Sequence, residues 1–348
     1  MLKEAMLYEQ LSGNKVECNL CGRRCIIPEG SLGFCLVRKN ENGKLYSLVY
    51  GKACSACADL IGKKPLSHFH PGSIVMSIAT VGCNFRCPFC INWVISQERE
   101  IKGYDFPPEK VVEVTRGNGC HGISYTYTEP TIFFEYAHDT ARLAHKQGLF
   151  NTFVTNGYMT PEAVGTIAPV LDAATVDFKG AGEPEFYKQF LKVPSVEPVY
   201  ESLKEMKKGG IHIEVTNLVV PKVGDSFERI RELAEWVSEN LGRDTPFHLL
   251  RFCPDYQRTD IPSTPLKTLE QACDTVREAR LNYVYIGNVS RHPFENTFCP
   301  NCKELLIKRY SFEIVKWQLT KEMRCAACGE NIAVKGQFHP GAFSSALM

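Results

Sequence analysis

The feature that most constrains the fold is a regular alternation of short β-rich runs and helical stretches from residue 74 to about residue 288. Runs such as SIVMSIAT, GISYTYT and AATVDF alternate with helical candidates such as PEKVVEVTRGN, TIFFEYAHDTARLAHKQG and SFERIRELAEWVSENLG. Repeated strand–helix units predict a parallel sheet covered by helices. We therefore expect an α/β fold with a partial or complete parallel (β/α) barrel of the TIM type. An open doubly wound sheet is the alternative, but no G-x-G-x-x-G follows the first strand.

The cysteine content sets the second constraint. The chain has 348 residues and 16 cysteines, which cluster at metal-ligand spacing. The start, MLKEAMLYEQLSGNK, has no apolar signal core, and no later run is long and apolar enough to span a bilayer. We therefore expect a cytoplasmic protein with reduced thiols that hold metal, and no membrane partner. The net charge of +1 gives the whole molecule no bias toward nucleic acid.

Two cysteine-rich segments flank the predicted barrel. We expect an N-terminal metal-binding module at 1–70, the barrel at 71–292, a zinc-ribbon-like module at 293–338 and a small polar tail at 339–348. In the N-terminal module, NENGKLYSLVYG predicts a hairpin with an Asn-Gly turn. A closed, structural metal centre is predicted there, and zinc and a 4Fe–4S cluster both fit its four ligands, Cys18, Cys21, Cys25 and Cys35.

The C-terminal segment contains two Cys-x2-Cys pairs, each resembling half of a zinc ribbon. Between the pairs, LLIKRY and FEIVKW alternate as a hairpin would. Four thiolates favour a tetrahedral zinc ion, with rubredoxin-type iron or an auxiliary cluster as the alternatives. The predicted ligands are Cys299, Cys302, Cys325 and Cys328. A further pair, Cys54-x2-Cys57, is either incidental or part of an extra cluster.

A third group of cysteines lies in VGCNFRCPFCINW, at Cys83, Cys87 and Cys90. Three thiols at this spacing could form a stripe on a helix, but Pro88 would break that helix at a cost of about 3 kcal/mol. We therefore predict a loop after the first barrel strand. Three thiolates suit a cube-shaped iron–sulfur cluster and leave one iron open for chemistry. The alternative is a structural zinc loop with a fourth ligand elsewhere.

The C-x3-C-x2-C triad, with Phe89 before its last cysteine, resembles the signature of the radical SAM superfamily. The wider runs KKPLSHFHPGSIVMSIATVGCNFRCPFCINWVISQ, YTYTEPTIFFEYA, TNLVVPKVGDSFERIRELAEWV and DTPFHLLRFCPDYQ are similar to the AmmeMemoRadiSam-system radical SAM enzymes. That group is akin to pyruvate formate-lyase activating enzymes. The resemblance implies a catalytic 4Fe–4S cluster on Cys83, Cys87 and Cys90, with S-adenosylmethionine (SAM) on the open iron and Phe89 beside the cofactor. It also implies a one-electron donor such as ferredoxin or flavodoxin.

Functional side chains of a β/α barrel lie at the C-terminal ends of its strands. Glu129 could pair there with the ammonium of SAM, or it could simply begin a helix. The resemblance assigns Lys179 to the SAM carboxylate, Asp177 to a monovalent cation and Asn156 to the Thr-Asn-Gly segment of activating enzymes. The remaining cofactor-side candidates at strand ends are Thr216, His248 and Gly287. Gly287 would allow close approach of adenine, and His248 is either a substrate-side or a structural residue.

Three functions follow. The first is a radical SAM oxidoreductase that cleaves SAM to a 5′-deoxyadenosyl radical and abstracts hydrogen from a protein, as a glycyl-radical activase does. The second is the same chemistry on a small molecule. The third is an RNA-modifying enzyme or zinc-ribbon nucleic-acid binder, which ranks last because acidic residues interrupt the ribbon's lysines and arginines. Nothing in the sequence selects the carbon that loses hydrogen.

Overall fold

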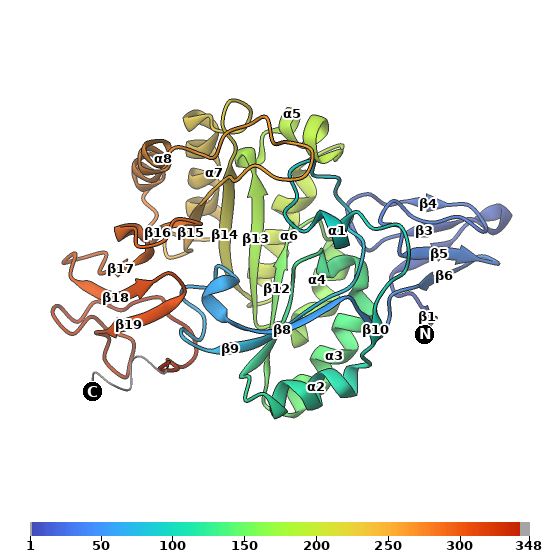
Figure 1. Ribbon diagram of the computed structural model, residues 1–348, viewed down its shortest axis with the longest axis horizontal. Coiled ribbons are helices and arrows are strands. Elements are labelled where there is room, and N and C mark those ends of the chain that lie inside the picture. The colour runs from blue at the N-terminus through green and yellow to red at the C-terminus, as the bar shows by residue number, and fades with distance from the viewer. Residues whose placement is uncertain (1, 342–348) are drawn as a thin grey trace.

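The computed structural model describes residues 2–341, and its centre is one curved sheet of eight strands (Figure 1). The strand order is β16-β15-β14-β13-β12-β11-β9-β8. Seven strands are parallel and follow chain order: β9 Ile74–Ala79, β11 Gly122–Tyr125, β12 Phe150–Thr155, β13 Ala173–Lys179, β14 His212–Val219, β15 Phe247–Arg251 and β16 Val284–Gly287. Such sequential order is that of a (β/α) barrel, because a doubly wound sheet reverses its order.

The barrel is partial. Among the described residues no pairing joins β16 to β8, and β8 (Ser55–Leu60) runs antiparallel to β9. β8 lies inside the segment 1–70, so this part of the chain contributes a strand to the main sheet as well as forming a cysteine-rich module. Its sequence, SACADL, has no β-branched or aromatic residue, which is why its composition does not indicate a strand.

Helices connect the strands and pack against the sheet, as the sequence predicts. They are α1 Trp93–Ser96, α2 Pro108–Gly117, α3 Phe134–Lys146, α4 Pro161–Ile167, α5 Pro184–Phe186, α6 Glu197–Lys208, α7 Phe227–Asn240 and α8 Leu266–Glu278. Shorter turns are η1 Ser12–Asn14, η2 Ile61–Lys63, η3 Pro130–Phe133, η4 Ala168–Val170, η5 Gly180–Gly182, η6 Tyr187–Leu191 and η7 Pro293–Glu295. Within residues 2–341, none of the helices combines the length and the apolar character needed to cross a membrane.

Two small modules flank the sheet at opposite ends of the view in Figure 1. The N-terminal one contains the sheets β1-β6-β5 and β2-β3-β4, and β7 pairs with β10. The bounds are β1 Lys3–Glu4, β2 Tyr8–Gln10, β3 Val16–Cys18, β4 Ile26–Ile27, β5 Arg38–Glu41, β6 Lys44–Ser47, β7 Lys52–Ala53 and β10 Tyr104–Asp105. Asn42 and Gly43 join β5 to β6 with φ of 54° and 77°, as an Asn-Gly hairpin turn requires.

The C-terminal module is a three-stranded sheet of β17 Thr297–Phe298, β18 Leu305–Tyr310 and β19 Glu313–Trp317. The predicted hairpin of LLIKRY and FEIVKW is confirmed as the antiparallel pair β18 and β19. Of the predicted tail, His339 hydrogen-bonds through its amide to the carbonyl of Pro71. Residues 342–348 lie outside the described part of the chain. The division into four domains remains a prediction.

Candidate cofactor site

The three central cysteines lie in an irregular loop between β9 and α1, so the prediction of a loop is confirmed. Gly82 opens the loop with φ of 96°, a conformation that favours glycine. A Cβ at this position would lie 2.8 Å from Val37 Cγ1 and 2.9 Å from the carbonyl oxygen of Cys35. The loop therefore starts in direct contact with the N-terminal module.

Two arginines fix the loop against that module. The Arg86 guanidinium donates hydrogen bonds to the carbonyl of Cys83 (2.7 Å) and to the carbonyl of Phe34. Arg23 donates from Nε to the carbonyl of Asn84 at 2.6 Å. Both guanidinium groups also face the Phe34 ring, at 3.4 Å for Arg23 and 4.3 Å for Arg86. The sequence analysis missed these arginines, although Arg86 lies inside the cysteine triad.

The opposite side of the loop is covered by the segment that follows β15. Phe89 is buried, and its ring lies 5.9 Å from Phe252 and 6.0 Å from Phe186. The amide of Gln257 donates to the carbonyl of Pro88 at 2.8 Å. Phe89 therefore helps to anchor the loop, while its predicted contact with the cofactor remains a prediction.

Asp177 and Lys179 end β13 on the same side of the strand, 3.8 Å apart. Thr216 on β14 donates to Asp177 at 2.6 Å. Burial by itself would lower the pKa of Lys179, but Asp177 and the thiols of Cys87 and Cys90 outweigh burial and raise that pKa. The structure thus brings a charged ammonium group, partnered by Asp177, up to the cysteine loop.

Of the three cysteines in the loop, Cys87 is buried, and Cys83 and Cys90 are half-buried. Burial raises the pKa of Cys87 to about 12 and that of Cys83 well above its ordinary value. These two thiols are therefore neutral at neutral pH unless a metal ion replaces their protons. Within residues 2–341, the only set of three or more metal-ligating atoms lying within 4.8 Å of one another is in the C-terminal module. The central sulfurs are thus too dispersed for one ion, whereas a cluster binds each thiolate through a different iron.

Glu129 and Asn156 organise the neighbouring strand ends. Glu129 Oε1 accepts from the amide (3.0 Å) and hydroxyl (2.6 Å) of Thr131 and from the hydroxyl of Thr155 (2.6 Å). Its Oε2 accepts from the amide of Asn156 at 2.7 Å, and burial raises the pKa of this carboxyl. Asn156 Nδ2 donates to Asn84 Oδ1 at 2.7 Å. Glu129 thus begins η3, and pairing with an ammonium group remains a prediction.

His248 and Gly287 have different surroundings. His248 Nε2 lies 2.7 Å from Glu214 Oε2, and its ring stacks on Tyr285. Glu214, two residues before Thr216 on β14, also accepts a hydrogen bond from the backbone amide of His68, while His248 itself is the register partner of Thr216 on the neighbouring strand. The structure brings His248 together with Glu214 and not with the cysteine loop. Gly287 packs against Leu250, whose Cδ2 atom would lie 2.4 Å from an added Cβ. The cofactor roles of both residues remain predictions.

The C-terminal cysteines form a compact tetrad. Sγ atoms of Cys299 and Cys328 are 3.6 Å apart, and those of Cys302 and Cys325 are 3.7 Å apart. Zn–S bonds of about 2.3 Å place tetrahedral sulfurs about 3.8 Å apart. The tetrad therefore fits one tetrahedral ion, and rubredoxin-type iron would have the same geometry.

Fold and site together define an α/β barrel with a thiol loop suited to a metal cluster at the C-terminal end of its first parallel strand. Residues 77–237 match the sequence family described as the radical SAM superfamily. The chain belongs to this superfamily, whose members use SAM and a 4Fe–4S cluster.

Three individual proteins are similar to this chain in sequence or in fold. An uncharacterized protein of Methanocaldococcus jannaschii is 49% identical over 336 residues, which cover 96% of this chain and 99% of that protein. A radical SAM methyltransferase from Sphaerobacter thermophilus superposes with a TM-score of 0.51 at 15% identity, over 64% of this chain and 68% of the other. SuiB of Streptococcus suis bound to S-adenosylmethionine gives 0.50 at 15% identity, over 65% and 55%. These two structures support the fold alone.

Proposed function

We propose that Cys83, Cys87 and Cys90 hold a 4Fe–4S cluster and that the chain uses it to cleave SAM reductively and abstract hydrogen from a substrate. When bound, the cluster would supply one electron to SAM, which then yields methionine and a 5′-deoxyadenosyl radical. The observation that carries the proposal is the position of Lys179, whose partly exposed ammonium lies at the end of β13, 3.8 Å from Asp177 and close enough to the thiols of Cys83, Cys87 and Cys90 to interact with them electrostatically. The Lys179–Asp177 distance of 3.8 Å is longer than a hydrogen bond, so the three N–H donors of the ammonium can serve the carboxylate of an amino acid.

The chain's own residues have distinct parts in this proposal. Lys179 would donate a charge-assisted hydrogen bond to the SAM carboxylate, while Asp177 and Thr216 fix its position. Glu129 holds the ends of β11 and β12 together, and its Oε2 accepts one hydrogen bond, which leaves capacity for an ammonium group. The packing of Phe89 against Phe252 would keep water from the loop.

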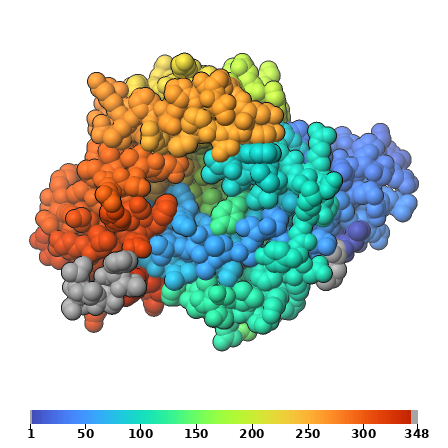
Figure 2. All heavy atoms as spheres, in the orientation of Figure 1, coloured from blue at the N-terminus to red at the C-terminus, as the bar shows by residue number. Residues whose placement is uncertain are grey.

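We propose a protein or peptide as the substrate. The surface is hollowed between the segment after β15, the C-terminal module and β8 (Figure 2). Among the described strands, β16 and β8 do not pair with each other, so the barrel is open between them. A partial barrel admits a chain segment more readily than a closed one does. A glycyl-radical-activase-like reaction would fit this opening. A small-molecule substrate is the alternative that the experiment below distinguishes.

The remaining parts of the proposal concern the C-terminal metal, the cellular compartment and the electron donor. We assign zinc to the C-terminal tetrad, because its sulfur spacing matches tetrahedral zinc. All sixteen cysteines are free thiols, which supports a reducing, cytoplasmic setting and a donor of the ferredoxin or flavodoxin class. Nucleic-acid binding has no support from the charge distribution.

Deuterium transfer tests the function and the substrate class together. Anaerobic, reconstituted protein is incubated with dithionite, SAM and either glycine-deuterated peptides or deuterated small metabolites, with the Cys87→Ala variant as the control. We expect deuterium from a peptide to appear in 5′-deoxyadenosine. Transfer only from a small molecule would replace the substrate proposal, and absence of 5′-deoxyadenosine from fully loaded protein would reject the function.

A further inference from the structure

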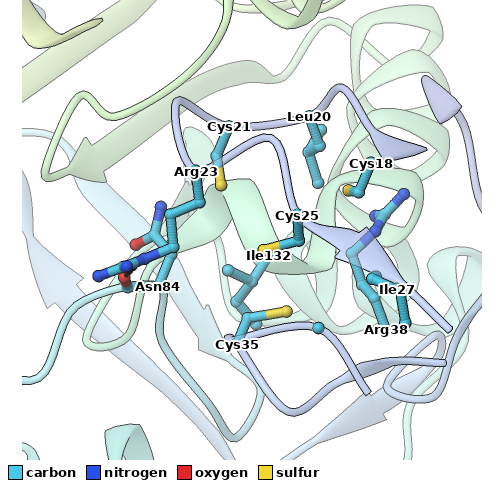
Figure 3. Close-up of a pocket in the computed structure, with 11 residues that line it drawn as sticks. Cys18, Leu20, Cys21, Arg23, Cys25, Ile27, Cys35, Arg38, Asn84 and Ile132 are labelled. Carbon is cyan, nitrogen blue, oxygen red and sulfur yellow. Dashed lines mark hydrogen bonds between the residues drawn. The ribbon is translucent and has the colours of Figure 1, made fainter. Parts of the chain in front are cut away.

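The four N-terminal cysteines surround one cavity (Figure 3). Cys18 ends β3, and Cys21, Cys25 and Cys35 lie in the loops on either side of β4. Apolar side chains of Leu20, Ile27 and Ile132 complete the wall of the cavity. A wall of this kind, with thiols and few other polar groups, suits a soft metal centre.

The spacing of these sulfurs argues against a single ion. Four thiolates on one zinc ion lie about 3.8 Å apart, as the C-terminal tetrad does. No three of the N-terminal sulfurs lie within 4.8 Å of one another, since the described residues contain only one such group and it is the C-terminal one. A cluster with one iron per cysteine separates the thiolates more widely. The spacing of the sulfurs therefore favours a 4Fe–4S cluster over a zinc ion, the two centres that the sequence leaves open.

Two unpartnered hydrogen-bond donors line the same cavity. Asn84 Nδ2 and Arg38 Nε are buried and find no hydrogen-bond partner among residues 2–341. Asn84 is 0% exposed and Arg38 is 1% exposed. The other nitrogens of Arg38 are already used, with NH1 bound to Glu135 at 3.0 Å and NH2 to the carbonyl of Met6 at 2.8 Å. Buried donors in native proteins are almost always satisfied, so these two indicate an acceptor inside the cavity. The sulfides of a cluster are such acceptors.

The cavity also adjoins the catalytic loop. Asn84 follows Cys83 directly in the chain, and Gly82 packs on the carbonyl of Cys35. Arg23, which lines the cavity, donates to the carbonyl of Asn84. A redox centre here would be separated from the cysteine triad by a few covalent and hydrogen bonds, whereas zinc could carry no electron.

We propose that Cys18, Cys21, Cys25 and Cys35 hold a second 4Fe–4S cluster, with the side chains of Asn84 and Arg38 donating to its sulfides. A ferredoxin- or flavodoxin-class donor would give one electron to this second cluster. The second cluster would then pass that electron to the catalytic cluster and return to its oxidised state. This electron route rests on the function proposed above, whereas the identity of the metal centre does not.

Acid-labile sulfide separates clusters from single ions, because zinc and rubredoxin-type iron contain none. Full-length protein is reconstituted anaerobically with iron and sulfide, and iron, sulfide and zinc are counted per chain. We expect about eight sulfides in the native protein and about four in the variant Cys83→Ala/Cys87→Ala/Cys90→Ala. Cys18→Ala/Cys25→Ala should also retain about four, and the control Cys120→Ala about eight.

The outcomes are distinguishable even if the N-terminal variant fails to fold. Retention of sulfide in the triple variant supports the second cluster by itself. A native protein with about four sulfides, all lost in the triple variant, would overturn the second cluster and leave the proposed function intact. About four sulfides that persist in the triple variant but vanish in Cys18→Ala/Cys25→Ala would instead reject the function.

The donor assignment has its own measurement. In the triple-variant background, Asn84→Leu should leave the iron count unchanged and make the midpoint potential of the remaining cluster more negative. The reason is that N–H donors to sulfide stabilise the reduced, more negative state. An unchanged potential would remove Asn84 from the proposal.

Discussion

The two four-cysteine groups at the ends of the chain share the Cys-x2-Cys spacing but differ in sulfur geometry and in what their modules contact. The C-terminal sulfurs lie 3.6 and 3.7 Å apart in pairs, while the N-terminal sulfurs surround a cavity. The N-terminal module contacts the loop of Cys83, Cys87 and Cys90 through Arg23 and Arg86. The C-terminal module contacts the segment that leads into β9, where Arg309 donates a hydrogen bond to the carbonyl of Ser67. Similar sequence spacing thus accompanies different sulfur geometry, and of the two groups it is the N-terminal one that adjoins the Cys83, Cys87 and Cys90 loop.

The largest expected effect concerns the C-terminal tetrad. Cys325→Ser, or removal of the ion by a chelator, should unfold this module, since metal binding supplies on the order of 10 kcal/mol to small zinc sites. Limited proteolysis should then cut within residues 297–334 while the barrel stays intact. Cleavage of SAM per chain should change less than about two-fold, because the module lies away from the cysteine loop. If SAM cleavage were lost together with the fold of this module, the C-terminal module would also support the cysteine loop, contrary to the comparison above.

The buried ion pair between Arg38 of the N-terminal module and Glu135 of α3 comes next. Glu135→Gln should lower the free energy of unfolding by about 3–5 kcal/mol, because Arg38 would keep its charge without a carboxylate partner. Thermal unfolding measures the effect. The exposed pair of Glu113 and Lys110 supplies the control, and Glu113→Gln should cost less than about 1 kcal/mol. Equal shifts in both variants would show that Arg38 does not depend on Glu135.

Lys179 tests the mouth of the barrel, between the two modules. Lys179→Met should raise the dissociation constant of SAM about 10- to 100-fold, the equivalent of losing a charge-assisted hydrogen bond worth about 1.5–3 kcal/mol. Calorimetry on cluster-loaded protein measures it. Lys208→Met, at an exposed position, should leave binding unchanged. If SAM binds both variants equally, Lys179 does not contact its carboxylate.

The smallest expected effect is a pH dependence of stability at His68, where the segment before β9 contacts the C-terminal module. Burial lowers the pKa of His68 to about 3, and its ring lies between the carbonyl of Ala333 and the hydroxyl of Tyr285. The unfolded chain, with a histidine pKa of about 6.5, binds more protons between these values, so stability falls as pH decreases below about 6.5. The loss should reach about 2 kcal/mol at pH 5.

His68→Gln should remove this component of the pH dependence. The comparison is the difference in melting temperature between pH 7.5 and pH 5 for the native protein and the variant, because acid damage to a cluster affects both equally. The groups facing His68 include Glu214, His212 and Arg309, which both proteins share. Identical pH dependence in the two proteins would contradict the assignment.

The sequence predicts the features that depend on local chemistry. Pro88 excludes a helix through the triad, Asn42-Gly43 sets the β5–β6 turn, and strand–helix repetition specifies the parallel sheet. Features that depend on distant partners are not predictable from these patterns. Arg38 meets Glu135 across 97 positions, and β8 forms only because the edge of β9 accepts it.

The site shows the same division. The proximity of Asp177 and Lys179 is predictable, since residues two positions apart on a strand point to the same side of the sheet. His248 is not, because its neighbour Glu214 comes from another strand 34 positions away. The unpartnered donors of Asn84 and Arg38 become visible only once their surroundings are known.

Cleavage of SAM by anaerobic, cluster-loaded protein with dithionite tests the central claim most directly. The account predicts 5′-deoxyadenosine from the native chain, and a fall to background with Cys87→Ala while the C-terminal metal is retained. Continued cleavage by Cys87→Ala, or none by a native chain with its full iron and sulfide, would contradict the assignment of the Cys83, Cys87 and Cys90 loop as the catalytic centre.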